Sequence, residues 1–262
     1  FGDPHYPRRL SRERSGEIAD VHVRSAADRG GFDVFDWKSL PHTRREVVGI
    51  AGLYGSRSVR TYLGEEATEE RLKSLGRGPR IVHVAAHGHY DERFPLSSFV
   101  ALSIPEEPGE DRDNGLLQAW EIFEGVRLDA DLVVLSGCRT GVGQEVGGEG
   151  LIGLTRAFQY AGARSVIASL WNVADRATAE LMVRFYRHLR AGRPMDAALR
   201  AAQTELIRGP IRVEDDGGAP VAKDASAPFY WAAFQLYGDW ESSIAISSAY
   251  SPSSTDSASR RP

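Results

Sequence analysis

The only cysteine of the chain, Cys138, ends the apolar run ADLVVLSGC and directly follows a glycine. Another apolar run, IVHVAA, leads into His87 and Gly88, 51 residues before the cysteine. A deprotonated thiol attacks carbonyl carbons, and a nearby imidazole can take the thiol proton or stabilise the thiolate. A glycine beside each residue lets the backbone turn sharply and approach a substrate. Cys138 and His87 are therefore a candidate nucleophile and general base that need no metal.

The same stretch, IVHVAAHGHYDE, offers a competing chemistry because it has three histidines within seven residues, His83, His87 and His89. It nearly spells the H-x-H-x-D-H zinc-binding loop of metallo-β-lactamase-like hydrolases, with Glu92 in place of the last histidine. Such a site needs further ligands from later strands. The only later histidine, His188, lies in the middle of an amphipathic stretch. We therefore expect no metal, and we interpret His83, which alternates with apolar residues, as structural.

Strand-like and helix-like segments alternate along the chain, which predicts an α/β fold with helices on both faces of a mostly parallel sheet. Candidate sites in such sheets lie at the carboxyl ends of the strands, where His87 and Cys138 stand. The predicted strands cover 58–63, 80–86, 97–104, 130–138, 164–171 and 228–240. The predicted helices cover 40–55, 68–76, 116–123, 148–163, 175–192 and 194–209. Capping signals support several of these boundaries: Thr43, Thr68, Gly162 and Pro194.

Composition excludes several function classes. Hydrophobic residues make up 42% and charged residues 26% of the 262 positions, which is ordinary for a globular protein. A net charge of −4 gives no electrostatic basis for nucleic-acid binding. No apolar run is long enough to span a membrane, and no signal peptide is recognisable. One cysteine permits no intrachain disulfide. We expect a cytoplasmic protein, and the bias towards arginine over lysine suggests a GC-rich, bacterial genome.

The ends of the chain are polar. Residues 1–31 show no sustained period and predict a loop with at most short elements, and residues 242–262 form a Ser-rich tail that we expect to be disordered. The sequence begins FGDPHY without an initiator methionine, so we expect a processed product or an excised piece.

Several motifs in order resemble the CHAT domain, a caspase-like cysteine peptidase family of the separase, gingipain and clostripain kind (clan CD). They are FGDPHY, LPHTRREV, IVHVAAHGHY, LVVLSGCRTGVG, GEGLIGLTRAFQYAGARSVIASLWNVAD and YWAAFQLYGDW. The resemblance implies a caspase-like three-layer αβα sandwich over residues 1–241. Such domains usually have another strand-rich segment before the FGDP stretch, so this one is expected to lack its N-terminal segment.

The resemblance also implies roles for individual residues. Cys138 matches the nucleophile and His87 the general base, while the backbone amides of Gly88 and Cys138 match the groups that bind the oxyanion. Asp175 matches an acidic position that lines the pocket for a basic P1 side chain, although capping of the helix near Arg176 explains it equally simply.

Glu149 stands at a helix start. There it either complements the helix dipole or lines the substrate site.

Together these features predict a cofactor-independent cysteine endopeptidase that hydrolyses peptide bonds of protein or peptide substrates after a basic residue. The resemblance implies regulation by a protein partner or by a TPR-type region of the parent protein. The alternative is a catalytically silent caspase-like interaction module. Reaction of Cys138 with a thiol-directed peptidyl electrophile separates the two.

Overall fold

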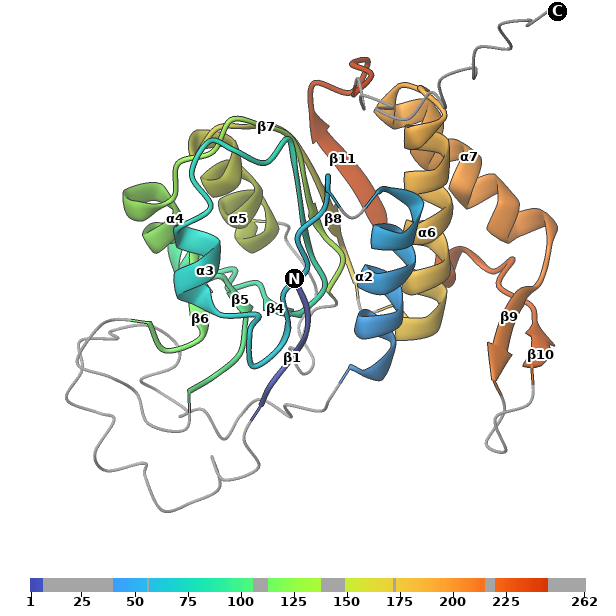
Figure 1. The fold of residues 1–262 in the computed structure, drawn as a ribbon, viewed down its shortest axis with the longest axis horizontal. Helices are drawn as coiled ribbons and strands as arrows, with labels where there is room; N and C mark the ends of the chain where they lie inside the picture. Colours follow the sequence, from blue (N-terminus) through green and yellow to red (C-terminus); the bar gives the residue numbers. More distant parts are fainter. Residues whose placement is uncertain are drawn as a thin grey trace, which may run out of the picture.

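A four-stranded sheet forms the centre of the computed structural model, which describes residues 1–6, 40–55, 57–105, 113–137, 149–171, 173–214 and 220–244. Its strands follow the order β11-β8-β7-β3 (Figure 1). Strands β3 (Ile81–Val84), β7 (Ala130–Leu135) and β8 (Ala163–Ser169) are parallel, and β11 (Phe234–Gly238) adds an antiparallel edge. The three parallel strands are mostly apolar, as expected for strands of a sheet that is covered on both faces.

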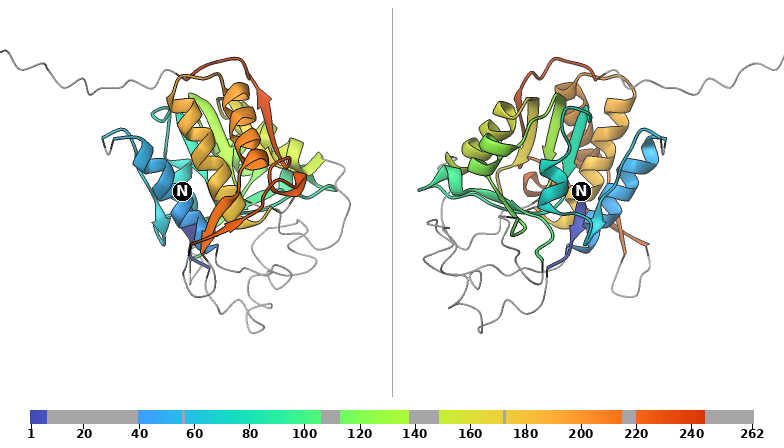
Figure 2. Two further views of the ribbon diagram at one scale, coloured as in Figure 1. Left: turned by 90° about the vertical axis from the view of Figure 1, so that its right-hand side faces the viewer. Right: turned by 60° about the vertical axis from the view of Figure 1, so that its left-hand side comes forward.

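Helices cover the two faces of this sheet (Figures 1 and 2). Alternate residues such as Val133 and Val166 pack in a core with α4 (Ala119–Gly125) and α5 (Glu149–Tyr160). Their neighbours Val134 and Ile167 face the opposite core, which is built with α2 (Pro41–Leu53), α6 (Asp175–Arg190) and α7 (Met195–Arg208). The alternation follows from the two-residue period of a strand. The predicted α/β class is confirmed.

Smaller sheets surround the central one. Strands β4 (His87–His89), β5 (Phe99–Ala101) and β6 (Leu116–Gln118) form an antiparallel sheet, and β1 (Gly2–Pro4) pairs in parallel with β2 (Leu63–Gly64). Strands β9 (Ile211–Glu214) and β10 (Pro220–Lys223) form a hairpin that the sequence patterns did not predict. The other elements in the described part of the chain are α3 (Glu69–Lys73) and two 3₁₀ turns, Pro95–Ser97 and Pro228–Tyr230.

Three local predictions need correction. Helix α2 begins at Pro41, so Thr43 is not its N-cap; the Thr43 hydroxyl instead donates to Leu40 O and accepts from the Asp3 amide. Residues 116–118 form β6 rather than the start of a helix, because they pair with β5. Residues 58–63 contribute only Leu63 to β2. By contrast, Thr68 caps α3 as predicted, and Gly162 follows α5 with a positive φ of 113°.

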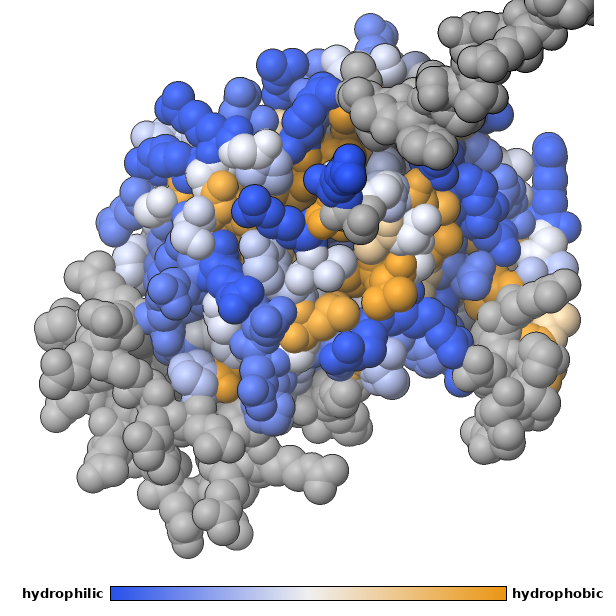
Figure 3. All heavy atoms as spheres, in the orientation of Figure 1, coloured by the Kyte–Doolittle hydropathy of each residue, from blue (hydrophilic) through white to orange (hydrophobic). Residues whose placement is uncertain are grey.

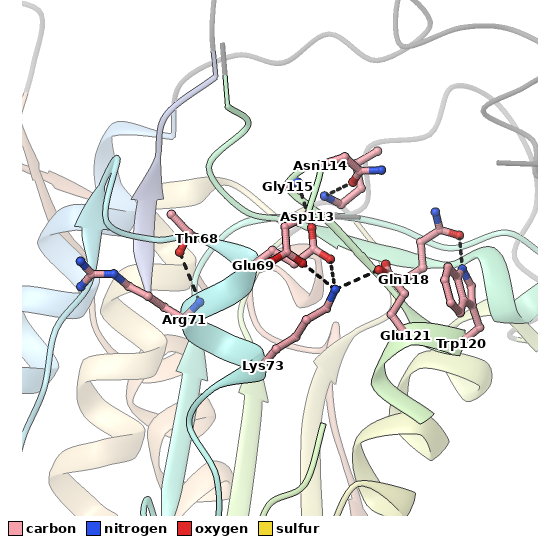
Figure 4. A network of polar contacts seen from close by, with 11 residues as sticks. Thr68, Glu69, Arg71, Lys73, Asp113, Asn114, Gly115, Gln118, Trp120 and Glu121 are labelled. Carbon is pink, nitrogen blue, oxygen red and sulfur yellow. Dashed lines mark hydrogen bonds and ion pairs between the residues drawn. The ribbon is translucent and has the colours of Figure 1, made fainter. Parts of the chain in front are cut away.

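A buried charge cluster fixes α3 against α4 and the approach to β6 (Figure 4). The Lys73 ammonium lies 2.6 Å from Glu69, 2.7 Å from Asp113 and 3.0 Å from Glu121. The second oxygen of Glu69 accepts the Gly115 amide, and that of Glu121 accepts the amide of Gln118. The Lys73 ammonium therefore holds together α3, the segment before β6 and α4.

The surface is mainly hydrophilic in the orientation of Figure 3, with small hydrophobic areas between the polar residues. The exposed large apolar side chains come from separate elements, such as Val48 of α2, Tyr160 of α5 and Val221 of β10. Scattered apolar residues of this kind are normal on a protein surface. No helix in the described part of the chain is long and apolar enough to cross a membrane. The predicted loop beyond residue 6 and most of the Ser-rich tail lie outside the described residues.

Candidate active site

The strands that lead to the two candidate catalytic residues are neighbours in the central sheet. Strands β3 and β7 run in parallel with Val84 opposite Leu135, so their carboxyl ends lie at one edge. The Ser136 amide continues the pairing by donating to Val84 O at 3.0 Å. From the other side, the buried Ser169 hydroxyl at the end of β8 donates to Gly137 O at 3.1 Å. The chain before Cys138 is thus tied to both adjacent strands.

The backbones of Gly137 and Ala86 are in close contact at this edge. A Cβ on Gly137 would lie 1.4 Å from Ala86 O, so only glycine fits against this backbone. Gly137 immediately precedes Cys138, and Ala86 immediately precedes His87. Cys138 itself lies outside the described residues. The close contact gives a physical reason for a glycine at this position, while the sharp turn expected from the sequence stays a prediction.

Strand β3 ends at Val84, and His87 is the first residue of the next strand, β4, in the small antiparallel sheet. His87 is buried, with 5% of the residue exposed, and the centroid of its imidazole lies 5.3 Å from that of the Tyr6 ring. The His87 amide donates to the Tyr6 hydroxyl at 3.4 Å. The sequence had placed His87 at the end of the central strand, whereas it belongs to the next strand of the chain.

The other residues predicted around this pair are only partly described. Gly88 lies opposite Val100 in the β4–β5 pair, so it follows His87 at the same edge of the small sheet. Glu149 is the first residue of α5. The oxyanion role of the Gly88 and Cys138 amides stays a prediction, as do both interpretations of Glu149.

Asp175 lies at the start of α6, directly after the loop that leaves β8. Its Oδ2 accepts the His42 amide at 2.9 Å. His42 is in the first turn of α2, where backbone amides have no partner within the helix. Asp175 therefore caps α2 rather than its own helix, whose N-cap is Ala174.

The environment of Asp175 also alters its protonation. Burial, with a smaller contribution from the charge of Glu46, raises the pKa of the carboxyl from an ordinary 3.8 to about 6. The hydrogen bond from the His42 amide and the charge of Arg176 act in the opposite direction. The carboxyl group is consequently ionised at neutral pH but only by a modest margin.

His83 belongs to a buried polar group below this edge. Its Nε2 lies 2.9 Å from Glu46 Oε1 and its Nδ1 lies 3.2 Å from the Tyr186 hydroxyl. The Ser136 hydroxyl is 3.4 Å from Nε2. These contacts agree with a structural histidine. Among the described residues, no group of His, Cys, Asp and Glu side chains could hold a metal ion.

Two contacts were not predicted from the sequence: that of Tyr6 with His87 and that of Glu46 with His83. Tyr6 belongs to FGDPHY, a motif without an assigned role, and it touches His87 from 81 positions away. Glu46 occupies an apolar face of α2 with no exposed surface. A charged residue on such a face was the available signal, because buried carboxylates require partners.

Comparison with known proteins gives one family and two curated relatives. The model of the CHAT domain matches residues 1–239. Tetratricopeptide repeat protein 28 of Mus musculus is 28% identical over 235 residues, which cover 79% of this chain and 9% of that protein. The protein of the same name from Homo sapiens matches to the same extent. This chain therefore spans about a tenth of the length of these mammalian relatives. The bacterial origin and cytoplasmic location expected from the sequence stay predictions.

Proposed function

Because the chain belongs to the CHAT domain family, whose model spans residues 1–239, we propose that it is a cysteine endopeptidase with a caspase-like αβα sandwich. Cys138 is its nucleophile and His87 its general base. The observation that carries the proposal is the contact between Gly137 and Ala86, which joins the chain segments that lead into these two residues.

The contact between Gly137 and Ala86 limits the distance between the residues that follow them, Cys138 and His87. Cys138 follows Gly137 and His87 follows Ala86 by one trans peptide each, which separates successive Cα atoms by ~3.8 Å, so we expect the Cα atoms of Cys138 and His87 to lie within about 10 Å of each other. Cysteine and histidine side chains pointing towards each other bridge such a distance with room for a substrate carbonyl. A long separation in the free protein is compatible with catalysis, since catalytic hydrogen bonds often tighten only in the substrate complex.

The proposed reaction uses these groups in sequence. The Cys138 thiol loses its proton to the His87 imidazole, and the thiolate sulfur attacks the carbonyl carbon of the scissile peptide bond. The amides of Gly88 and Cys138 donate to the oxyanion, each contributing about 3–4 kcal/mol. The imidazolium returns the proton to the leaving amine, which leaves a thioester. Water then hydrolyses the thioester and regenerates the thiol.

We assign specificity for a basic P1 side chain to Asp175. Its helix starts beyond the carboxyl end of β8, at the same edge of the parallel strands as the ends of β3 and β7. An ionised, partly buried carboxylate favours arginine over lysine where it meets a planar guanidinium side-on. A library of peptides that differ only at P1 tests this with wild type and Asp175→Asn. Equal turnover of arginine, leucine and aspartate substrates by wild type would return Asp175 to a purely capping role.

The proposed substrates are proteins or peptides, and the proposed regulator is a protein partner. The relatives are named as tetratricopeptide repeat proteins and are far longer than this chain. This supports control by a TPR-type region of a parent protein.

The decisive experiment is covalent labelling with a peptidyl electrophile that has arginine at P1. Wild type should gain the mass of one probe on Cys138, while Cys138→Ala should gain none and His87→Ala should react at least tenfold more slowly. Thermal melting of each variant controls for folding. A folded wild type that neither reacts nor cleaves peptides would instead support the catalytically silent interaction module.

A further inference from the structure

Tyr6 connects the candidate general base to the strand opposite it. The hydroxyl of Tyr6 donates to Ala101 O at 2.9 Å and accepts the His87 amide at 3.4 Å. His87 and Ala101 are partners in the β4–β5 register, so the hydroxyl bridges the pair at which β4 begins. The ring of Tyr6 also lies against the imidazole, with centroids 5.3 Å apart. One side chain therefore contacts both the backbone and the ring of His87.

The backbone that carries Tyr6 is itself fixed. The His5 amide donates to the Ser103 hydroxyl at 3.0 Å, and His5 O accepts the Ile104 amide at 3.0 Å. The Ser103 hydroxyl in turn donates to Gly64 O at 2.6 Å. Tyr6 thus extends from a segment that is anchored to the chain following β5. A rigid support of this kind defines the position of a neighbouring side chain more closely than a flexible one does.

We propose that Tyr6 is a positioning residue that sets the place and orientation of the His87 imidazole for proton transfer with Cys138. This inference rests on the proposed function. The Tyr6 hydroxyl can serve at any working pH, because burial raises its pKa well above the usual range and keeps it protonated. It can therefore donate to Ala101 and accept from His87 at the same time.

Tyr6→Phe removes the hydroxyl and retains the ring. With the bridge lost, kcat should fall by about tenfold to about a hundredfold with KM changed less than about twofold, because small misplacements of a catalytic group cost rate rather than binding. Tyr62→Phe is the matched control, since the Tyr62 ring contacts Phe1 and Arg71 instead of His87. This control should retain the wild-type kcat. A Tyr6→Phe variant with wild-type kcat and KM would overturn the proposal.

A coupling measurement separates positioning from general destabilisation. In the His87→Ala background, Tyr6→Phe should cause no further loss of the residual labelling rate, because the residue that it positions is already absent. An equal loss in both backgrounds would contradict a role through His87.

A second readout does not depend on catalysis. In the folded Cys138→Ala protein, Tyr6→Phe should shift the NMR signals of the His87 amide and imidazole and speed exchange of that amide by more than about tenfold. Unchanged His87 signals would overturn the inference. Failure of wild type to react at Cys138 would refute the proposed peptidase, while these signals would still decide whether Tyr6 positions His87.

Discussion

Replacing Gly137 with alanine should separate the two strand ends on which the candidate site depends. The added Cβ would lie 1.4 Å from Ala86 O, whereas ordinary contact begins at 3.4 Å. One backbone must therefore move by about 2 Å. Both are held, since the Gly137 carbonyl accepts the Ser169 hydroxyl and the preceding Ser136 amide donates to Val84. Overpacking in a fixed environment costs about 1–3 kcal/mol, and the depth of this overlap indicates the upper end.

Thermal and urea unfolding of Gly137→Ala measure this cost. A loss of about 3 kcal/mol corresponds to a fall in Tm of about 6–12 °C for a chain of this size. The reaction rate of Cys138 with the peptidyl electrophile should fall more steeply than stability suggests, because the displacement lies between Cys138 and His87. Gly52→Ala is the matched control: a Cβ there meets nothing within 4 Å, and alanine is the better helix former in α2. Wild-type stability and labelling in Gly137→Ala would refute the reasoning.

Two further substitutions test the charged groups. Lys73→Met removes the ammonium partner of two buried carboxylates, Glu69 (1% exposed) and Glu121 (7% exposed). The free energy of unfolding should therefore fall by about 3 kcal/mol. Arg71→Met, on the same helix, removes an exposed contact to Glu66 at 3.9 Å and the guanidinium group over the Tyr62 ring, and should cost about 1 kcal/mol. Equal costs in urea unfolding would contradict a structural role for the cluster. Asp175 should make the folded state less stable as pH rises from about 4 to about 6, because its pKa of about 6 when folded exceeds the ordinary 3.8 and the folded state binds the extra proton. Asp175→Asn should remove this part of the pH dependence in melts at pH 4 to 7, and identical slopes in the two proteins would show that the carboxyl does not titrate there.

The central sheet was predictable because its strands are nearly continuous apolar runs. The sequence patterns located β3, β7 and β8 and the helices between them, and parallel strands joined by helices must have their carboxyl ends at one edge. The importance of the glycine beside Cys138 was also recognisable, although the sequence explained it by a sharp turn. The residue that makes a glycine necessary there, Ala86, lies about fifty positions away in the chain, so the local sequence does not reveal it.

The remaining parts of the site depend on contacts between distant segments. The break between β3 and β4 cannot be read from the run IVHVAAHGH, because the pairing of His87 with Ala101 decides it. Asp175 has the residue type of a helix cap, but the helix that it caps is α2, more than a hundred positions earlier. Periodicity reports which face a residue occupies and does not identify the group on the other side.

The anchoring of Tyr6 has a consequence for the order in which the molecule folds. Its bonds join residues 81 and 95 positions apart, and the neighbouring His5 bond joins residues 98 positions apart. Closing loops of this length costs chain entropy before any contact repays it, whereas β7 and β8 are joined by a much shorter segment that contains α5. We therefore expect the support of His87 to form after the central sheet. In pulsed hydrogen exchange during refolding, the His87 amide should become protected later than that of Val133, and simultaneous protection would contradict this order. A newly made chain would then pass through a stage in which its core is complete and the candidate general base His87 is still unsupported.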